Sequence, residues 1–179
     1  KTSENYYGAW NTQFIVIDIL EELKEVVFDD DSVFLLDSDM IFNKSIDNIP
    51  EKLLFEQKVL LYTIPYELTY KINGLNRIEL LEISTEINES FPDDEFIYCG
   101  GEFLCCLGSE VHKIADVARN TFQVCLERCE RGLAKFNEEA HLLSYVYHVL
   151  GYRHGTANYY IKRIWTNRDV YSNVDNTEK

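Results

Sequence analysis

Two aspartates, Asp37 and Asp39, follow a short apolar run, residues 33–36, in the segment VFLLDSDMIF. Side chains two positions apart on an extended strand point the same way, so these carboxylates are expected to project together from the end of a strand. Two carboxylates aimed at one point repel each other unless a cation lies beside them. A hard divalent ion, Mg²⁺ or Mn²⁺, prefers such oxygen ligands and completes its shell with water and substrate phosphates. The spacing therefore predicts a metal site for a phosphate-bearing substrate, with a solvated strand-to-loop junction as the alternative.

A second group of chemically useful residues comes from the segment FNEEAHLLSYVY. Glu138, Glu139 and His141 fall in the first turn of an expected helix. Acidic residues at a helix start are favoured by the helix dipole, and this is the plain explanation for them. In a third segment, FIYCGGEFLCCLG, the pair Gly100–Gly101 would let the backbone approach a ligand closely.

The elements that must position these residues alternate between helical and extended patterns. Helices are predicted over residues 11–28, 49–57, 109–132 and 137–151, the last two with Ser109 and Asn137 as N-caps and Gly132 and Gly151 as stops. Strands are predicted over residues 33–36, which should be buried on both faces, over residues 58–64, and on either side of a break at Gly100–Gly101. The segment 157–166 is expected to be extended. For residues 77–90, helix and extended chain are both left open. The mixture places the chain in the α/β class.

Composition limits the partners and the compartment. The chain has 179 residues, 46% of them hydrophobic, which suits one domain over residues 1–166 followed by a polar tail, 167–179. A net charge of −14 argues against nucleic acid as a partner, since phosphate-backbone binding needs a basic patch. Five cysteines without zinc-site spacing indicate buried free thiols and a reducing, cytoplasmic compartment, with the secretory-pathway lumen left open. No apolar run is long enough to span a membrane.

Three segments carry a resemblance to a known class of enzymes. VFLLDSDMIF resembles the Asp-x-Asp motif of glycosyltransferases with the GT-A fold. FNEEAHLLSYVY and FIYCGGEFLCCLGS resemble segments of one retaining family in that class, the blood-group type alpha-1,3-galactosyl and N-acetylgalactosaminyl transferases. The three segments occur in the same order as in that family. The resemblance covers roughly residues 10–165 and implies a GT-A-like mixed sheet flanked by helices.

The resemblance implies a metal-dependent transfer of a hexose from a nucleotide diphosphate sugar, such as a UDP-sugar, to a glycan or another hydroxyl acceptor. Asp39 would bind Mn²⁺ or Mg²⁺ directly, and Asp37 would reach the metal, a water on it or the ribose. A metal on the diphosphate stabilises the charge of the leaving group without proton transfer. Four residues would line the donor: Ser38, Gly100, Gly101 and Glu102.

The same resemblance assigns roles on the predicted helix that starts near residue 137. Glu139 would lie beneath the anomeric carbon, as nucleophile or as stabiliser of positive charge, which favours retention of configuration. Glu138 and His141 would contact acceptor hydroxyls. Ala140 stands where the family has serine, and Glu138 where it has aspartate.

Cations and aromatic residues complete the expectations. Lys162, Arg163 and His154 are candidates for contacts with the diphosphate, with surface ion pairing as the alternative. Tyr6, Tyr7 and Trp10 are candidates for stacking on the base, or else part of the core. The nucleotide-binding βαβ units that open a GT-A fold are absent from these residues. Two explanations are left open: these units precede Lys1, where a membrane anchor would also lie, or the numbering skips residues.

Two other readings of the motif remain open. In a haloacid-dehalogenase-type phosphatase, Asp37 would be the nucleophile and Asp39 the acid, with Thr63 in the second motif. Met40 follows the aspartates where a threonine or its equivalent is usual in that class, which counts against it. A non-catalytic GT-A-like domain that binds a sugar nucleotide is the third reading. It is favoured if Glu139 lies far from the aspartates in space.

Overall fold

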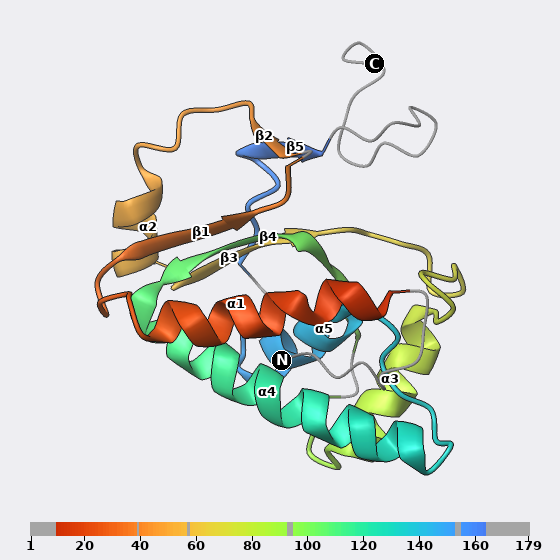
Figure 1. The fold of residues 1–179 in the computed structure, drawn as a ribbon. Helices are drawn as coiled ribbons and strands as arrows, with labels where there is room; N and C mark the ends of the chain where they lie inside the picture. Colours follow the sequence, from red (N-terminus) through yellow and green to blue (C-terminus); the bar gives the residue numbers. More distant parts are fainter. Residues whose placement is uncertain (1–9, 39, 57, 93–94, 153–154, 164–179) are drawn as a thin grey trace.

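The computed structural model describes residues 10–38, 40–56, 58–92, 95–152 and 155–163. These residues form a mixed α/β fold with two small antiparallel sheets and five α-helices (Figure 1). The α/β class is therefore confirmed. Several predicted residues lie outside this description: Tyr6, Tyr7, Asp39, His154 and the polar tail.

The larger sheet has the strand order β1-β4-β3. The middle strand, β4 (Cys99–Leu107), pairs antiparallel with both β1 (Ser32–Leu36) and β3 (Val59–Thr63). Residues of β4 from Phe103 onward are buried, in keeping with their unbroken apolar sequence. The prediction that the strand before Asp37 is covered on both faces was wrong. In the described part of the chain β1 pairs only with β4, and its first four residues are half-buried.

Strand β4 runs without interruption through the glycine pair, so the predicted break at Gly100–Gly101 was also wrong. The strand assignment continues through both residues, but the pairing with β3 is irregular there. Leu61 lies opposite Leu104 and Thr63 opposite Cys99, so the extra residues, 100–103, are on β4 and include the glycine pair. A glycine pair disfavours a strand through its entropy and often marks a bulge, which agrees with the irregular pairing at these two residues.

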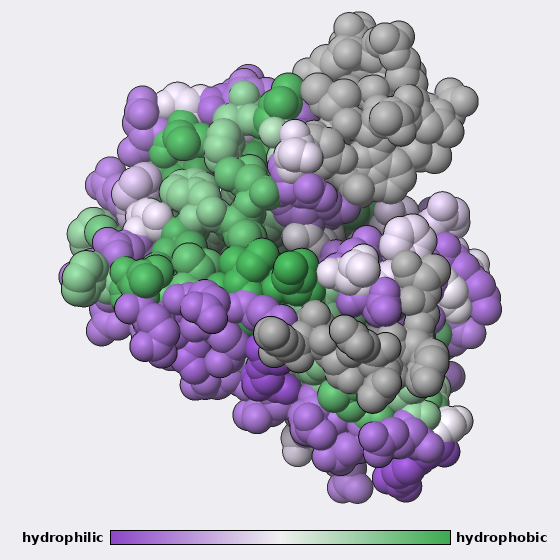
Figure 2. Space-filling view, in the orientation of Figure 1, coloured by the Kyte–Doolittle hydropathy of each residue, from purple (hydrophilic) through white to green (hydrophobic). Residues whose placement is uncertain are grey.

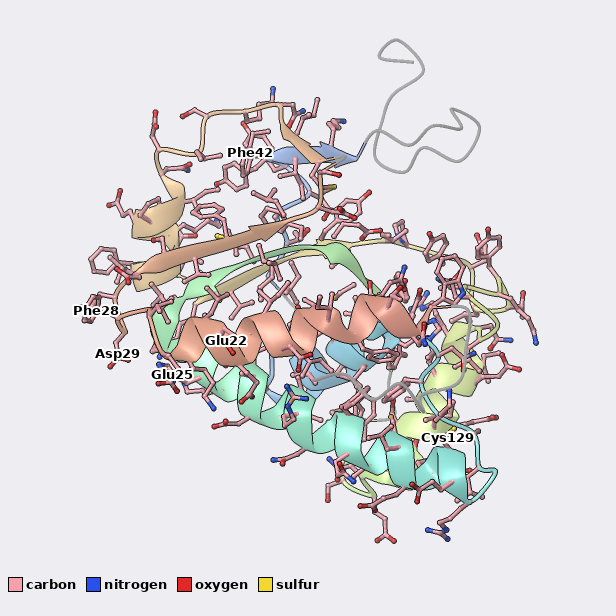
Figure 3. All side chains as sticks on the ribbon, in the orientation of Figure 1. Glu22, Glu25, Phe28, Asp29, Phe42 and Cys129 are labelled. Atoms are coloured by element: carbon pink, nitrogen blue, oxygen red, sulfur yellow. The ribbon has the colours of Figure 1, made fainter. Side chains whose placement is uncertain are left out.

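The smaller sheet begins directly after the Asp-x-Asp segment. Strand β2 (Met40–Phe42) pairs antiparallel with β5 (Ile161–Arg163), so that Met40 lies opposite Arg163. Phe42 joins the two sheets, because its ring makes edge contacts with Phe34 of β1 and Phe103 of β4 at 6.1 and 6.4 Å (Figure 3).

Helices α1 (Ile15–Lys24), α4 (Gly108–Glu130) and α5 (Glu139–Val149) lie on one side of the larger sheet (Figure 1). A short 3-10 helix, η1 (Asn11–Phe14), precedes α1, and the Phe14 ring packs at 5.2 Å from that of Phe122 on α4. Helix α2 (Ile49–Phe55) has Pro50 in its first turn, as the sequence predicts.

The open segment, residues 77–90, is resolved as a helix, α3 (Arg77–Ile87). Asn76 and Glu79 form a capping box in which each side chain accepts a hydrogen bond from the other residue's backbone N–H, at 2.9 and 2.8 Å. The predicted caps Ser109 and Asn137 were wrong, since α4 begins at Gly108 and α5 at Glu139 without a side-chain cap.

The predicted stops at Gly132 and Gly151 are confirmed. Both glycines have positive φ angles, 68° and 77°. After α4, the N–H of Leu133 reaches the carbonyl of Arg128 at 2.9 Å, which is the bond pattern of a Schellman motif. The same pattern closes α5, so each helix ends where glycine allows the left-handed conformation.

The face seen in Figure 2 divides into an apolar and a hydrophilic region. Figure 2 shows apolar residues gathered over β1 and the adjoining side of α1, with hydrophilic residues over α4 below them. Ile15, Val26 and Phe28 are among the exposed apolar side chains of this region. In the described part of the chain, no helix combines the length and the apolar character needed to cross a membrane.

Candidate functional site

The candidate site lies where the end of β1, the start of β4 and the start of α5 meet. Two adjoining cavities of about 340 and 260 Å³ occupy this region and share four lining residues: Gln13, Gly101, Glu102 and Glu139. The smaller cavity is also lined by Asp37. The aspartate segment and the glutamate helix, about a hundred residues apart in the sequence, therefore border one cavity.

Asp37 follows β1 directly and is fixed through its backbone. Its N–H donates to the carbonyl of Glu102 at 2.8 Å, which extends the β1–β4 pairing by one step. Its carboxylate accepts from the N–H of Ser38 at 2.8 Å and remains exposed. An exposed carboxylate at the rim of a cavity is the kind of ligand that Mg²⁺ or Mn²⁺ uses when water and substrate phosphates supply the other positions.

The described residues do not by themselves form a complete metal site. Among them, no group of three or more His, Cys, Asp and Glu side chains has the arrangement to hold a metal ion. Asp37 fits as one ligand, and the position of the second predicted ligand, Asp39, lies outside the description. Such a site would thus depend on the substrate for part of its coordination.

Glu139 is the first residue of α5 and points at the start of β4. A Cβ atom on Gly101 would lie 3.2 Å from Cδ of Glu139 and closer still to its Oε1, so the absence of a side chain at Gly101 makes room for this carboxylate. Burial raises the pKa of Glu139 to about 8, with further increases from the negative charges of Glu138 and Glu102. Glu139 therefore holds a proton at neutral pH in the protein without ligand.

Glu138 lies next to it and is only 3% exposed. Its Oε1 accepts a hydrogen bond from the Tyr98 hydroxyl at 2.9 Å, and its Oε2 accepts one from the side-chain amide of Asn73. The imidazole Nε2 of His141 lies 3.0 Å from Oε1. Two hydrogen bonds thus fix this carboxylate in the lining of the larger cavity, beside Glu139, and the His141 ring lies against it without hydrogen-bond geometry.

His141 is completely buried and lines neither cavity. Its Nδ1 accepts the N–H of Asn137 at 3.3 Å, which leaves the proton of the neutral ring on Nε2. Burial lowers the pKa of His141 to about 3, so the ring stays uncharged. His141 therefore contacts Glu138 and neither cavity, and its predicted contact with the acceptor stays a prediction.

The remaining predicted donor residues divide into two groups. Gly101 and Glu102 line both cavities, whereas Gly100 and Ser38 line neither. A Cβ atom on Gly100 would collide with the carboxylate of Glu102, so this glycine makes room for a side chain, just as Gly101 does. The two glycines were predicted to let a ligand approach the backbone. In the structure, the carboxylates of Glu102 and Glu139 occupy the space beside them.

The predicted diphosphate contacts lie on β5. Lys162 pairs with Ile41, is half-buried, and is absent from the lining of both cavities. Arg163 lies opposite Met40, one position from Asp39, although the description does not extend to its side chain. These two contacts, and that of His154, remain predictions.

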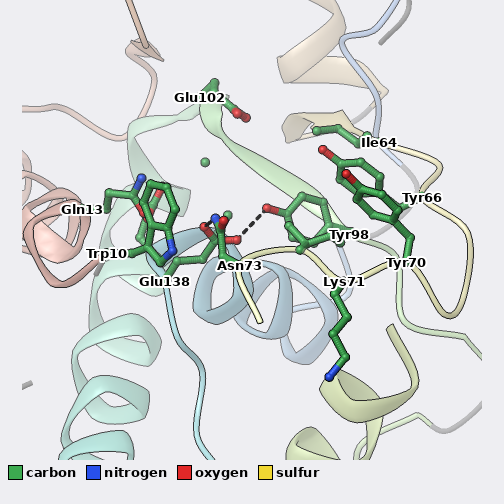
Figure 4. Close-up of a pocket in the computed structure, with 14 residues that line it drawn as sticks. Trp10, Gln13, Ile64, Tyr66, Tyr70, Lys71, Asn73, Tyr98, Glu102 and Glu138 are labelled. Atoms are coloured by element: carbon green, nitrogen blue, oxygen red, sulfur yellow. Dashed lines mark hydrogen bonds between the residues drawn. The ribbon is translucent and has the colours of Figure 1, made fainter. Parts of the chain in front are cut away.

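Sequence reasoning missed most of the larger cavity. Its walls include Trp10, Tyr66, Tyr70 and Tyr98 together with Gln13, Lys71 and Asn73 (Figure 4). The segment PYELTYKING, dense in tyrosine and polar residues, was a signal that could have indicated a binding loop. Trp10, a predicted candidate for stacking on a base, lines this cavity and not the one that Asp37 borders.

The phosphatase reading finds little to support it here. The Thr63 hydroxyl lies 3.4 Å from the side chains of both Thr156 and Asn158, and Thr63 lines neither cavity. Its backbone also bonds the Asn158 side chain in both directions, at 3.0 and 2.7 Å. Thr63 thus serves to attach the segment after residue 155 to the end of β3.

Comparison with known proteins does not assign the chain to a family. No protein-family model matches the chain, and no curated protein sequence matches it. The case for a function therefore depends on the residues and their geometry.

Proposed function

We propose that this chain is a metal-dependent glycosyltransferase that moves a hexose from a nucleotide diphosphate sugar to a hydroxyl acceptor. The observation that carries the proposal is that Asp37 and Glu139 border the same cavity. A retaining transferase needs a carboxylate close to the reacting carbon and a second group that binds the diphosphate beside it. The resemblance of the three segments to the GT-A class supports the same assignment, including a GT-A-like sheet.

In this proposal Asp37 and Asp39 bind Mn²⁺ or Mg²⁺ together with the diphosphate of the donor. The bound metal would neutralise the charge that develops on the departing nucleoside diphosphate. Asp37 is suited to this role because its backbone is fixed by Glu102 while its carboxylate is free to face the cavity. Glu102, which lines both cavities, is placed to accept hydrogen bonds from hydroxyls of the transferred sugar.

Glu139 acts at the anomeric carbon, as nucleophile or as stabiliser of positive charge. Either role requires the ionised carboxylate, whereas burial beside Glu138 and Glu102 keeps Glu139 protonated before substrate binds. Positive charge nearby lowers the pKa of a carboxylic acid. Binding of the donor with its cation, and the positive charge that develops on the sugar, would therefore favour the reactive form only when substrate is present.

The proposal is tested by thermal stabilisation with UDP and a panel of UDP-hexoses, each with and without Mn²⁺. A ligand that binds only the folded state raises the melting temperature. We expect stabilisation that requires both nucleotide and metal and that Asp37→Asn abolishes. Asp47→Asn, which changes an exposed aspartate outside both cavities, is the matched control. The absence of any nucleotide effect in the presence of metal would contradict the proposal.

A chromogenic phosphate ester separates the transferase from the phosphatase reading. Hydrolysis of p-nitrophenyl phosphate that Asp37→Asn removes and Glu139→Gln leaves intact would favour a phosphatase. Conversely, Glu139→Gln should eliminate transfer while leaving metal-dependent nucleotide binding in place, since Glu139 is assigned to the reacting carbon and not to the diphosphate. Binding retained by a wild-type protein that transfers no sugar would favour the non-catalytic reading.

A further inference from the structure

One side of the larger cavity is aromatic. Tyr66 and Tyr70 stack at a centroid distance of 5.1 Å with an angle of 11° between their rings, and Tyr98 meets Tyr66 edge-on at 5.3 Å. Figure 4 shows Trp10 with Gln13 on the opposite side of the cavity. Tyr70 and Trp10 are 53% and 40% exposed, so both rings retain surface that a ligand can cover.

The loop that carries the tyrosines is held in place from several directions. Arg77, the first residue of α3, donates to the carbonyls of Tyr66 and Phe96 at 2.9 and 2.7 Å. Farther along, the Asn137 side chain donates to the carbonyl of Asn73 at 3.1 Å. Asn73 itself adopts a positive φ of 47°, which is uncommon for a residue other than glycine. The aromatic side is therefore preorganised, and preorganisation reduces the entropy lost on binding.

The other groups in this cavity are polar and can both donate and accept hydrogen bonds. Gln13 and Asn73 supply amide groups, and Glu102 and Glu138 supply carboxylates. The Lys71 ammonium is turned away from the cavity, toward Glu79 at 3.5 Å (Figure 4). A ring with hydroxyls around its edge and C–H groups on its face satisfies both kinds of surface. A lipid chain would leave the polar groups unpaired, which is costly. A base of the donor is not favoured here either, because Asp37 borders the other cavity.

We propose that the larger cavity binds the acceptor and that this acceptor is a saccharide whose pyranose ring packs against Tyr70 and Tyr66, with Trp10 on the opposite side. The assignment of this sugar as acceptor rests on the proposed function, because Glu139 is shared by both cavities. A donor in the cavity bordered by Asp37 and an acceptor in the aromatic cavity would then meet at the same carboxylate. The volume, about 340 Å³, is within the usual range for a ligand pocket of about 300–1,000 Å³.

Saturation-transfer-difference NMR tests the sugar site directly. The probes are the methyl glycosides of glucose, galactose, mannose and N-acetylglucosamine at millimolar concentration, with the full chain in the presence of Mn²⁺ and UDP. We expect at least one glycoside to receive saturation at its ring C–H protons. Tyr70→Ala should weaken its binding by about fivefold, the range expected from loss of an aromatic contact.

The matched control is Tyr159→Ala, which removes a tyrosine that is even more exposed than Tyr70, lies outside both cavities and should leave sugar binding unchanged. Failure of all four glycosides to bind the wild-type chain would overturn the inference. So would equal binding by the wild type and Tyr70→Ala. Thermal stabilisation by UDP and Mn²⁺, measured on the same samples, separates the two proposals. A nucleotide effect without sugar binding would contradict only the saccharide site. Sugar binding without a nucleotide effect would contradict only the transferase.

Discussion

At the scale of single residues, the charge state of Glu139 controls what the shared carboxylate can do. Its pKa is raised to about 8, mainly by burial. Between the ordinary value of 4.5 and about 8, the folded protein keeps this proton while the unfolded chain loses it. Rising pH therefore favours the unfolded state over that interval, and the destabilisation is complete above pH 8.

Glu139→Gln should remove this effect, because glutamine does not ionise in either state. We expect the variant to match the wild type below about pH 4.5 and to become progressively more stable than it up to about pH 8, by on the order of 5 kcal/mol. Urea unfolding across this pH range measures the difference. Glu82→Gln, at an exposed position on α3, is the control and should show no such trend. A constant difference between Glu139→Gln and wild type would show that Glu139 is ionised in the folded protein.

Gly101 and Glu139 should be energetically coupled. Because a Cβ atom at position 101 would occupy the space of the Glu139 carboxylate, Gly101→Ala should destabilise the fold by about 1–3 kcal/mol. In a Glu139→Ala background the collision is gone, and the cost should fall to a few tenths of a kcal/mol. A double-mutant cycle by denaturant unfolding measures the coupling. Additive effects would mean that the strand or the helix shifts to admit the methyl group.

At the scale of elements, the capping box before α3 supports the aromatic side of the larger cavity. Asn76→Ala should cost about 1 kcal/mol in urea unfolding, because it leaves the Glu79 N–H without its cap. Asn76→Ser, which restores a side-chain oxygen, should recover most of that loss. Since Arg77 at the start of this helix holds Tyr66, Asn76→Ala should also weaken sugar binding. Equal stability of the alanine and serine variants would indicate that the cap contributes little.

The elements that the sequence predicted well are those with strong local signals. Gly132 and Gly151 end their helices because few other residues adopt the required φ. Pro50 lies in the first turn of α2 because its fixed φ suits a helix and an N–H there would have no partner within the helix. Strand β4 was predicted with a break at Gly100–Gly101 because local preference disfavours glycine in strands, whereas pairing with β1 and β3 is a tertiary effect.

The candidate site, like the fold, was predicted only in part. The types and order of Asp37 and Glu139 indicated that they would act together, and the structure places both at one cavity. The burial of His141 and the aromatic side of the larger cavity were not predictable, because both depend on which segments pack against the start of α5. A short sequence motif contains no information on those neighbours.

At the scale of the whole molecule, burial should protect the thiols. The described cysteines are free, four are buried, and Cys129 near the end of α4 is partly exposed (Figure 3). Burial raises the pKa values of Cys99 and Cys105 to about 12, which suppresses the reactive thiolate. We expect a maleimide to label one thiol in the native protein and five after denaturation. Cys129→Ser should abolish native labelling, and rapid labelling of a second thiol would show that the core opens readily.

The cavity is assembled from segments that are distant in the chain. Asn73 and Tyr98 reach Glu138 across 65 and 40 positions, and the bond from Asp37 to Glu102 joins two further segments. Contacts between residues so far apart in the sequence form late, because a long loop must close before each contact can form. A chain emerging from the ribosome can therefore have no cavity until α5 has been synthesised and has docked. Fragments that end before Glu138 should be inert even if their local helices and hairpins form.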